Sequence, residues 1–297
     1  MRTLLAAVDG GSLSAASRTL GMPLPTVSRK VSELEAHLGT QLVVRTSRKL
    51  LLTDAGSAFV VASRRVLEDL GNAERAASGE YEAPRGDLLV TASIMFGKLY
   101  LTPIVIDFLR AYPEVNVRVV LADHVIDLVE NHVDAAIRIG RLPDSGLVAT
   151  KVGEIRWVIC ASPDYLASHG TPNAPDDLTG HDCIGFEGLQ PVRAWPFQSA
   201  AGLLDIPIRP RFSVNTADAV ITAAVAGLGI ARITSYQAAA ELRQGGLISM
   251  LGGFTGPPLP IHLVHTGPPM LPLKLRAFLD FSGPRLRAAL AAIPRGG

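Results

Sequence analysis

The strongest constraint on the fold is a change of residue pattern at the segment Glu-Ala-Pro-Arg-Gly, residues 82–86. Before this segment, apolar residues recur once per helical turn, as they do along amphipathic helices. After it, short apolar runs alternate with helical segments, a pattern typical of a mostly parallel sheet covered by helices. A chain of 297 residues is also too long for one ordinary core. We therefore expect a mainly helical first unit and a second unit of two α/β lobes.

The net charge changes sign near the same place. Residues 1–65 hold nine Lys and Arg against four Asp and Glu, a net charge of +5, and the rest holds 19 against 23, a net charge of −4. A basic head on a mildly acidic body is typical of a polyanion-binding module fused to another domain. The 48% hydrophobic content excludes a disordered chain. Because we find no apolar run long enough for a membrane span and no secretory leader, we expect a cytoplasmic protein.

The first unit should contain three short helices and a small hairpin. The helices are expected at Leu4–Val8, Ser14–Leu20 and Pro25–Leu38, because glycines follow each of them and Pro is tolerated in a first turn. The apolar residues of the third helix fall on one face and should pack on a small core. They are Val27, Val31, Leu34 and Leu38. Two extended runs, Leu42–Arg45 and Leu50–Thr53, predict a basic hairpin.

The second and third helices, joined by a turn at residues 21–23, are a candidate helix-turn-helix. In that motif the second helix lies in the major groove with its N-terminal residues at the base edges, and the first crosses the backbone. A basic hairpin suits phosphate or minor-groove contact. The candidate DNA contacts are Ser14, Pro25, Thr26, Ser28, Arg29, Lys30, Arg45, Thr46, Arg48 and Lys49. The alternative is that these side chains form an ordinary solvated face of a helical bundle.

A longer helix is expected from Ser57 to Ala77. Its apolar residues form a narrow stripe, which is more typical of a pairing seam between two helices than of a globular core face. The stripe consists of Phe59, Ala62, Val66, Leu70, Ala73 and Ala77. This helix therefore predicts a dimer.

In the second unit, strands and helices should alternate through both lobes. The expected strands are Leu88–Ala92, Val115–Leu121, Ala135–Ile139, Val158–Cys160, Ile184–Phe186 and Ile230–Ile233. The expected helices are Thr102–Ala111, Val125–Asn131 and Ala217–Ala226. We expect the chain to cross between the lobes near residues 160–162 and to return near residues 262–266.

Two motif runs in the first unit closely resemble the LysR-type transcriptional regulators. They are GSLSAASRTLGMPLPTVSRKVSELEAHLGTQL at residues 11–42 and RTSRKLLLTDAG at residues 45–56. Four segments of the second unit resemble the effector-binding domain of that family. They are PRGDLLVTA at 84–92, FLRAYPEV at 108–115, DAAIRIG at 134–140 and AGLGIA at 226–231. The resemblance spans essentially the whole chain.

This resemblance implies a sequence-specific transcriptional regulator of three parts. A winged helix-turn-helix would span residues 1–57, a linker helix that pairs two subunits residues 58–83, and an effector-binding domain like the periplasmic binding proteins residues 84–297. Lobe 1 of that domain would hold residues 84–160 and 266–297, and lobe 2 residues 161–265. The implied partners are double-stranded DNA, a small effector bound between the lobes, other copies of the chain in a homotetramer, and RNA polymerase. No cofactor is implied.

The chain departs from the family pattern at the start of its third helix. Pro23 and Leu24 stand where a polar residue and Gln are usual, and Val43 replaces the Phe of the family's Leu-Phe-x-Arg run. The first helix is also shorter than usual. Base reading by the front of the third helix is therefore left open.

Effector contacts are expected where strands end and helices begin, because ligands of open α/β sheets bind there. The candidates are Ser93, Ile94, Phe96, Asp123, His124, Arg141, Asn215 and Thr216. Arg141 favours an organic anion, because guanidinium binds carboxylates bidentately. The alternative for Ser93 and Asn215 is helix capping, which both residue types favour.

Two other functions compete with a regulator, and a redox sensor is a further alternative within the regulator interpretation. An enzyme is disfavoured, because no His pair has metal-ligand spacing and no nucleophile-elbow or phosphate-loop motif occurs. A transport-type binding protein is disfavoured by the basic head and the lack of a leader. A redox sensor would rest on Cys160 and Cys183, for which we expect buried structural roles.

Overall fold

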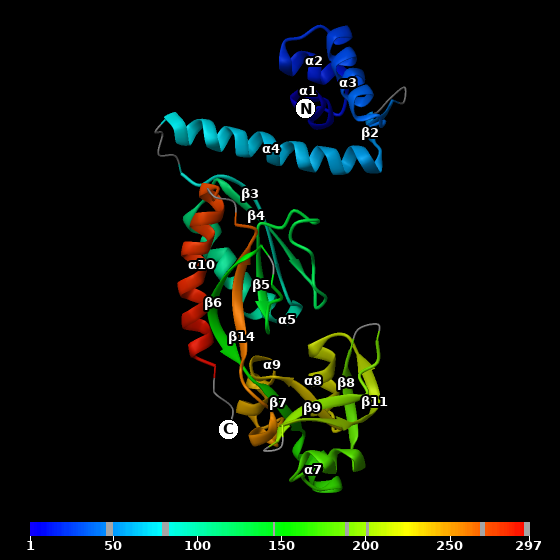
Figure 1. Cartoon of the computed structure of the whole chain (residues 1–297), viewed down its shortest axis with the longest axis vertical. Helices are drawn as coiled ribbons and strands as arrows, with labels where there is room; N and C mark the ends of the chain where they lie inside the picture. The colour runs from blue at the N-terminus through cyan, green and yellow to red at the C-terminus, as the bar shows by residue number, and fades with distance from the viewer. Residues whose placement is uncertain are drawn as a thin grey trace. The chain divides into compact units, whose positions relative to one another are not determined.

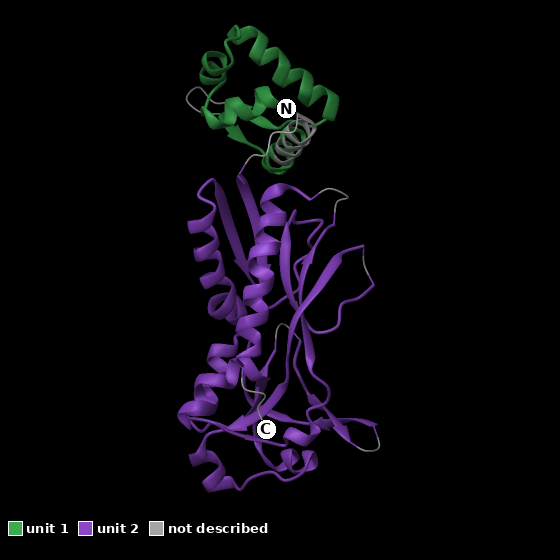
Figure 2. Ribbon diagram, turned by 90° about the vertical axis from the view of Figure 1, so that its left-hand side faces the viewer, with its two compact units in different colours: residues 1–82 green, residues 83–297 purple. Residues whose placement is uncertain are grey.

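A computed structural model describes residues 1–45, 50–78, 83–144, 146–187, 190–199, 202–267 and 271–293. They form two compact units, Met1–Glu82 and Ala83–Gly297, which are green and purple in Figure 2. Each unit has hydrophobic clusters of its own. The expected division into a helical first unit and a two-lobed α/β second unit is confirmed.

The first unit has the helices and the hairpin that its pattern predicts. Its helices are α1 (Arg2–Asp9), α2 (Leu13–Leu20), α3 (Leu24–Leu38) and α4 (Asp54–Ser78), and its strands are β1 (Val43–Arg45) and β2 (Leu50–Leu52), which pair antiparallel (Figure 1). Local signals set the ends of α2: Ser12 Oγ accepts a hydrogen bond from Ala15 N at 3.1 Å, and Gly21 follows the last residue with φ +62°.

The apolar face of α3 packs as expected except at its last turn. Val27 and Val31 are buried and Leu34 is partly buried, in clusters formed with α1, α2, the hairpin and α4. Leu38 stays 39% exposed, because these clusters do not extend to the end of the helix. The expectation that Leu38 faces the core is therefore wrong.

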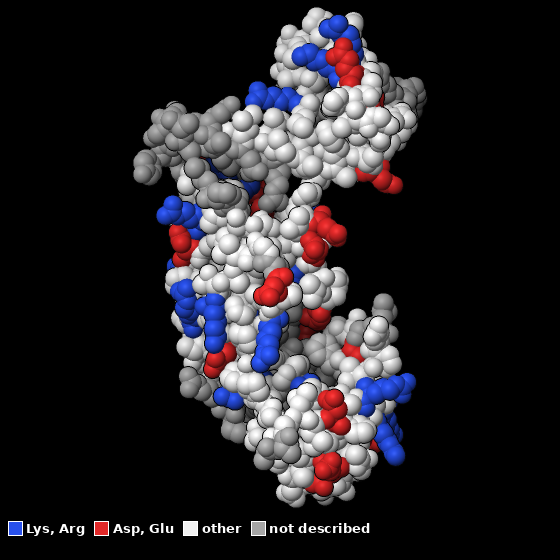
Figure 3. Space-filling view, in the orientation of Figure 1, with Lys and Arg blue, Asp and Glu red and all other residues white. Residues whose placement is uncertain are grey.

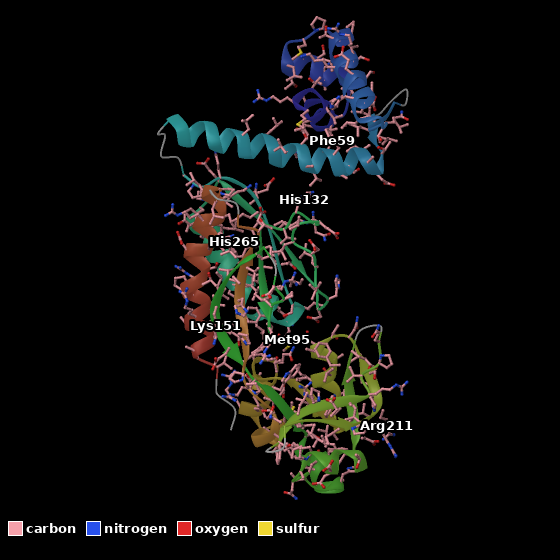
Figure 4. The ribbon with its side chains drawn as sticks, in the orientation of Figure 1. Phe59, Met95, His132, Lys151, Arg211 and His265 are labelled. Atoms are coloured by element: carbon pink, nitrogen blue, oxygen red, sulfur yellow. The ribbon has the colours of Figure 1, made fainter. Side chains whose placement is uncertain are left out.

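The stripe along α4 is shorter than the sequence pattern indicates. Phe59 packs against the core cluster of the first unit, beside the buried Val60 (Figure 4). Val66 and Leu70 are 51% and 46% exposed. The side chains of Ala73 and Ala77 lie outside the described residues. Phe59 therefore packs on the core of the first unit and is not part of a free seam.

Lobe 1 is a five-stranded sheet in the order β4-β3-β5-β14-β6. The strands are β3 (Gly86–Ala92), β4 (Val115–Leu121), β5 (Ala135–Ile139), β6 (Val148–Ile155) and β14 (Leu259–His265). After β3 come the short α5 (Ile94–Phe96) and a π-helical turn, Gly97–Leu101. The helices α6 (Thr102–Ala111) and α10 (Leu273–Ala291) supply Phe108 and Phe278 to the main core of this lobe.

Lobe 2 is a second five-stranded sheet in the order β11-β8-β12-β7-β13. Its strands are β7 (Trp157–Ala161), β8 (Asp182–Phe186), β11 (Arg209–Val214), β12 (Ile230–Thr234) and β13 (Ile248–Met250). One cluster lies between this sheet and α8 (Ala217–Val225) and α9 (Ser235–Gln244). A separate cluster joins the sheet to α7 (Pro163–His169) and to the hairpin of β9 (Ala194–Ser199) and β10 (Gly202–Pro207). The 3₁₀ turns Pro175–Gly180 and Gly252–Phe254 complete the lobe.

The lobe boundaries and the strand directions differ from the expectation. The change of sheet falls at Arg156, between β6 and β7, and the return falls just before β14. The strand β6 was not expected, because most of its side chains are exposed at the sheet edge and form no apolar run. Both sheets are mixed: β14 is antiparallel to β5 and β6, and β7 is antiparallel to β12 and β13. Parallel neighbouring strands need a crossover connection, usually a helix. The strands β7 and β14 each follow a direct passage of the chain between the lobes, so they can be antiparallel to their neighbours.

The expected helix at Val125–Asn131 is not formed: residues 125–127 have no regular structure and residues 128–132 form turns. Asp127 Oδ1 accepts hydrogen bonds from Val129 N and Glu130 N, each at 2.8 Å. A short polar side chain that binds nearby backbone N–H groups in this way competes with helix formation. Val125 and Val129 are 83% and 65% exposed, so no apolar helix face is buried here.

Candidate DNA-binding surface and effector site

The start of α3 is fixed by its turn with α2. Gly21 takes the left-handed conformation that favours Gly, and Ser17 Oγ donates to Met22 O at 2.6 Å across the turn. Pro23 precedes the helix with φ −55° and ψ 140°, and Pro25 lies in the first turn, where its missing N–H removes no helical bond. The turn sequence therefore sets the position at which α3 begins.

Most candidate DNA contacts on α2 and α3 face solvent. The exposed ones are Ser14, Pro25, Arg29 and Lys30, and the half-buried ones are Thr26 and Ser28. The Arg29 side chain is 70% exposed, with its Nε 3.7 Å from Glu33 Oε1 one turn along the helix. An exposed ion pair of this kind contributes little to stability, so Arg29 can exchange it for a phosphate or a base. Figure 3 shows Lys and Arg side chains at the surface of this unit.

The strands β1 and β2 of the first-unit hairpin are described, but not the residues between them. Thr46, Arg48 and Lys49 lie outside the described residues, as does the side chain of Arg45. The strands on either side are described, with Val43 opposite Leu52. The basic candidates are therefore placed only by their connection to these strands.

A carboxylate on α3 anchors this hairpin. Glu35 Oε1 accepts hydrogen bonds from Leu42 N at 2.8 Å and Val43 N at 3.0 Å. Thr53 Oγ1, after β2, donates to Gln41 O at 2.8 Å. These bonds satisfy backbone groups that the short ladder leaves unpaired, and they join the hairpin to the helix. Glu35 is not among the residues expected from the sequence, because its only signal is an acidic residue beside the apolar face of α3.

At one edge of the lobe 1 sheet, the structure brings Ser93, Ile94 and Asp123 together. Because β3 and β4 are parallel, with Ala92 opposite Leu121, the residues after both strands lie at the same edge. Asp123 Oδ1 accepts a hydrogen bond from Ile94 N at 3.0 Å. Arg141 follows β5, which is also parallel to β3, and is exposed at that edge.

Lobe 2 contributes a tyrosine to this edge. Tyr236, on α9, is 3% exposed and packs in the core cluster of lobe 1. Its ring centroid lies 5.5 Å from that of Phe96 and 5.9 Å from that of Tyr100, both in edge-to-face geometry. Met95 packs against clusters of both lobes, and Figure 4 shows it at the end of lobe 1 nearer to lobe 2. The two lobes therefore meet at α5.

Two buried hydroxyl groups beside Tyr236 lack a well-formed hydrogen bond. Ser93 Oγ and Thr234 Oγ1 have no partner in good geometry within the described part of the chain. Burial raises the pKa of the Tyr236 hydroxyl, and both neighbouring hydroxyls act against this rise. A ligand oxygen at this place would give both hydroxyls a well-aligned partner in addition to Tyr236. Thr234 and Tyr236 were not identified from the sequence, because nothing local links them to Ser93.

The other effector candidates lie elsewhere or in the core. Phe96 is fully buried in the lobe 1 core, so its ring packs there instead of lining a cleft. His124 lines a groove of about 560 Å³ on lobe 1 together with Arg118. Asn215 is exposed, and Thr216 precedes α8. Capping explains neither Ser93 nor Asn215: Ser93 makes no side-chain cap bond, and the cap position of α8 is Thr216.

Both cysteines are buried, on opposite sides of the lobe 2 sheet. Cys160 on β7 packs in the cluster with α8 and α9, and Cys183 on β8 packs in the cluster with the β9–β10 hairpin. The strand β12 lies between them. Burial raises the pKa of each thiol to about 12. In the described residues, no three His, Cys, Asp or Glu side chains are grouped to hold a metal ion.

We expect DNA binding to be insensitive to peroxide. The thiolate is the reactive form, and a pKa of about 12 keeps both thiols protonated at neutral pH. The native protein should react slowly with iodoacetamide, and the urea-unfolded protein should react quickly at both sites. A DNase footprint that moves with peroxide in the unmodified protein, but not in the Cys160→Ser/Cys183→Ser variant, would contradict this.

A helix-turn-helix unit joined to a two-lobed α/β unit with a polar site between its lobes defines a DNA-binding protein that carries a ligand-binding domain. Comparison with known families agrees. Residues 1–57 match the bacterial regulatory helix-turn-helix protein, lysR family, and residues 82–287 match the LysR substrate binding domain. The chain belongs to the LysR family of transcriptional regulators.

Individual relatives are similar along nearly their whole length. The chain is 34% identical over 283 residues to an HTH-type transcriptional regulator of Xanthomonas campestris, covering 94% of this chain and 82% of that protein. It is 34% identical over 275 residues to the regulator CrgA of Neisseria meningitidis, covering 92% of each. The solved CrgA structure matches with a TM-score of 0.62 at 33% identity, covering 96% of this chain and 97% of that one. Full-length AphB, a virulence activator of Vibrio cholerae, matches with a TM-score of 0.61 at 28% identity, covering 94% and 96%.

These comparisons bear on the rival functions. The relatives are named as transcriptional regulators, which are not enzymes. Among the helices that the structure describes, none combines the length and apolar content that crossing a bilayer requires.

Proposed function

We propose that this LysR-type regulator binds its operator through α3 and the first-unit hairpin, under control of an organic anion bound beside Ser93. The exposed side chains at the front of α3 support the first part. The proposed DNA contacts are Ser14, Pro25, Thr26, Ser28, Arg29, Lys30, Arg45, Thr46, Arg48 and Lys49. The protein acts on double-stranded DNA in the cytoplasm, where RNA polymerase is a further partner.

The single observation that carries the effector site is the pair of buried hydroxyls where the lobes meet, which lie beside Tyr236 and have no well-aligned hydrogen-bond partner. Ser93 comes from lobe 1 and Thr234 from lobe 2, so one ligand oxygen between them would contact both lobes. A ligand that binds one arrangement of the lobes better than another shifts the equilibrium toward it. Arg141 at the same sheet edge supplies positive charge for a carboxylate.

Pairing of two copies is proposed through α4. Val66 and Leu70 are one helical turn apart and about half exposed, which is unfavourable for a helix that stays alone in water. A second copy of α4 would cover both. A homotetramer would then need a further contact between effector domains.

A thermal-shift screen of small mono- and dicarboxylates, each beside its neutral amide, tests the effector site. At a hundredfold excess over Kd, binding adds about 2.7 kcal/mol and raises Tm by roughly 5–10 °C. We expect Ser93→Ala to keep the unliganded Tm, because this hydroxyl makes no cap bond, and to lose most of the shift.

The matched control is Ser168→Ala, which removes an exposed hydroxyl from α7 and should keep the full shift. An amide that shifts Tm as much as its acid would contradict the proposal that the effector is an anion. A full shift in Ser93→Ala would contradict the site.

A further inference from the structure

The front of α3 offers DNA an aliphatic side chain and few free backbone N–H groups. Pro23 and Pro25 have no N–H group. The N–H of Thr26 is already used, since it donates to Pro23 O at 2.9 Å. Leu24, the first residue of the helix, is 43% exposed and belongs to neither hydrophobic cluster of the first unit that contains α3 residues.

This arrangement is unusual for a helix start, because the leucine is 43% exposed and joins no core cluster of the first unit that contains α3 residues. Side chains at the N-terminus of the second helix of a helix-turn-helix meet the base edges in the major groove. A leucine in that position cannot accept or donate a hydrogen bond. Its partner on DNA must therefore be apolar.

One base offers such a partner. In the major groove, thymine presents its C5-methyl group, whereas guanine, adenine and cytosine present polar atoms or an unsubstituted C5–H. An aliphatic side chain against those polar atoms would remove water from them without replacing its hydrogen bonds. We propose that Leu24 is a specificity-determining residue that selects a thymine in each operator half-site through its methyl group. This inference rests on the proposed placement of α3 in the major groove.

Deoxyuridine provides the test, because it differs from thymidine only by that methyl group. Full-length protein would first select its preferred duplexes from a random library at fixed salt. Each thymine of the selected half-site would then be replaced by deoxyuridine, one at a time, and Kd measured by gel shift. Burial of one methyl group corresponds to about a fourfold change in affinity. With the unmodified protein, we expect deoxyuridine at one thymine per half-site to weaken binding about fourfold. With Leu24→Ala, deoxyuridine at that position should leave Kd unchanged.

Leu38→Ala is the matched control, because Leu38 is on the same helix and is similarly exposed, at 39%. This variant should keep the deoxyuridine penalty. A penalty that persists in Leu24→Ala, or that disappears in Thr26→Ser instead, would overturn the assignment to Leu24. So would a preferred duplex whose thymines can all be replaced without loss. A library that yields no preferred duplex would contradict the proposed function itself.

Discussion

Replacing Arg29 with Ala should weaken operator binding by roughly 5- to 150-fold, since one good bidentate contact contributes about 1–3 kcal/mol. Arg29 is 70% exposed on α3, and its partner within the chain is the exposed Glu33, with Nε 3.7 Å from Oε1. The variant should keep its Tm, because exposed ion pairs contribute little to stability. Gel shifts on the selected duplex and on a scrambled one would measure the effect.

The two duplexes also separate the two roles open to this guanidinium. If Arg29 reads a base, the loss should be larger on the selected duplex. If Arg29 holds a phosphate, both duplexes should lose affinity equally. The slope of log affinity against log salt concentration should then fall in magnitude by about 1. The matched control is Arg276→Ala on α10, where an equally exposed arginine lies 3.8 Å from Asp280 one turn along. Unchanged binding by Arg29→Ala would show that α3 does not lie in the groove as proposed.

Replacing Gly56 with Ala should destabilise the first unit by roughly 3 kcal/mol, at the upper end of the range for overpacking. In most helix interiors this change stabilises by roughly 0.5–1 kcal/mol. Here an added Cβ would lie 1.9 Å from the carbonyl oxygen of Leu42, a backbone atom that cannot rotate away. Either α4 or the hairpin must shift. Urea unfolding followed by circular dichroism would measure the loss, and operator binding should weaken with it because the hairpin moves.

Gly180→Ala is the control for this prediction. A Cβ at Gly180 meets nothing within 4 Å, so the stability of that variant should be nearly unchanged. If Gly56→Ala is as stable as the unmodified protein, the close approach of α4 to Leu42 is not maintained in solution.

Local patterns predicted the elements whose signals are local. The helices α2 and α3 end at glycines with positive φ and carry regular apolar faces, and both lie within a residue of their predicted bounds. The apolar spacing predicted the wrong element where a polar side chain forms hydrogen bonds with nearby backbone N–H groups. At Val125–Asn131 the bonds from backbone N–H groups to Asp127 favour turns, although the apolar spacing indicates a helix.

The candidate sites also have parts that local sequence predicts and parts that depend on tertiary contacts. Local patterns were enough to predict the two-part organisation, the exposed front of α3 and the position of Ser93 and Asp123 after their strands, because each depends on residues close together in the chain. Tertiary packing brings Thr234 and Tyr236 beside Ser93, attaches the hairpin to Glu35 and packs Phe59 against a core cluster. The contact of Ser93 with Tyr236 joins residues far apart in sequence and depends on where the chain changes sheets at Arg156. The contacts of Glu35 and Phe59 depend on how the helices and the hairpin pack, which no local periodicity encodes.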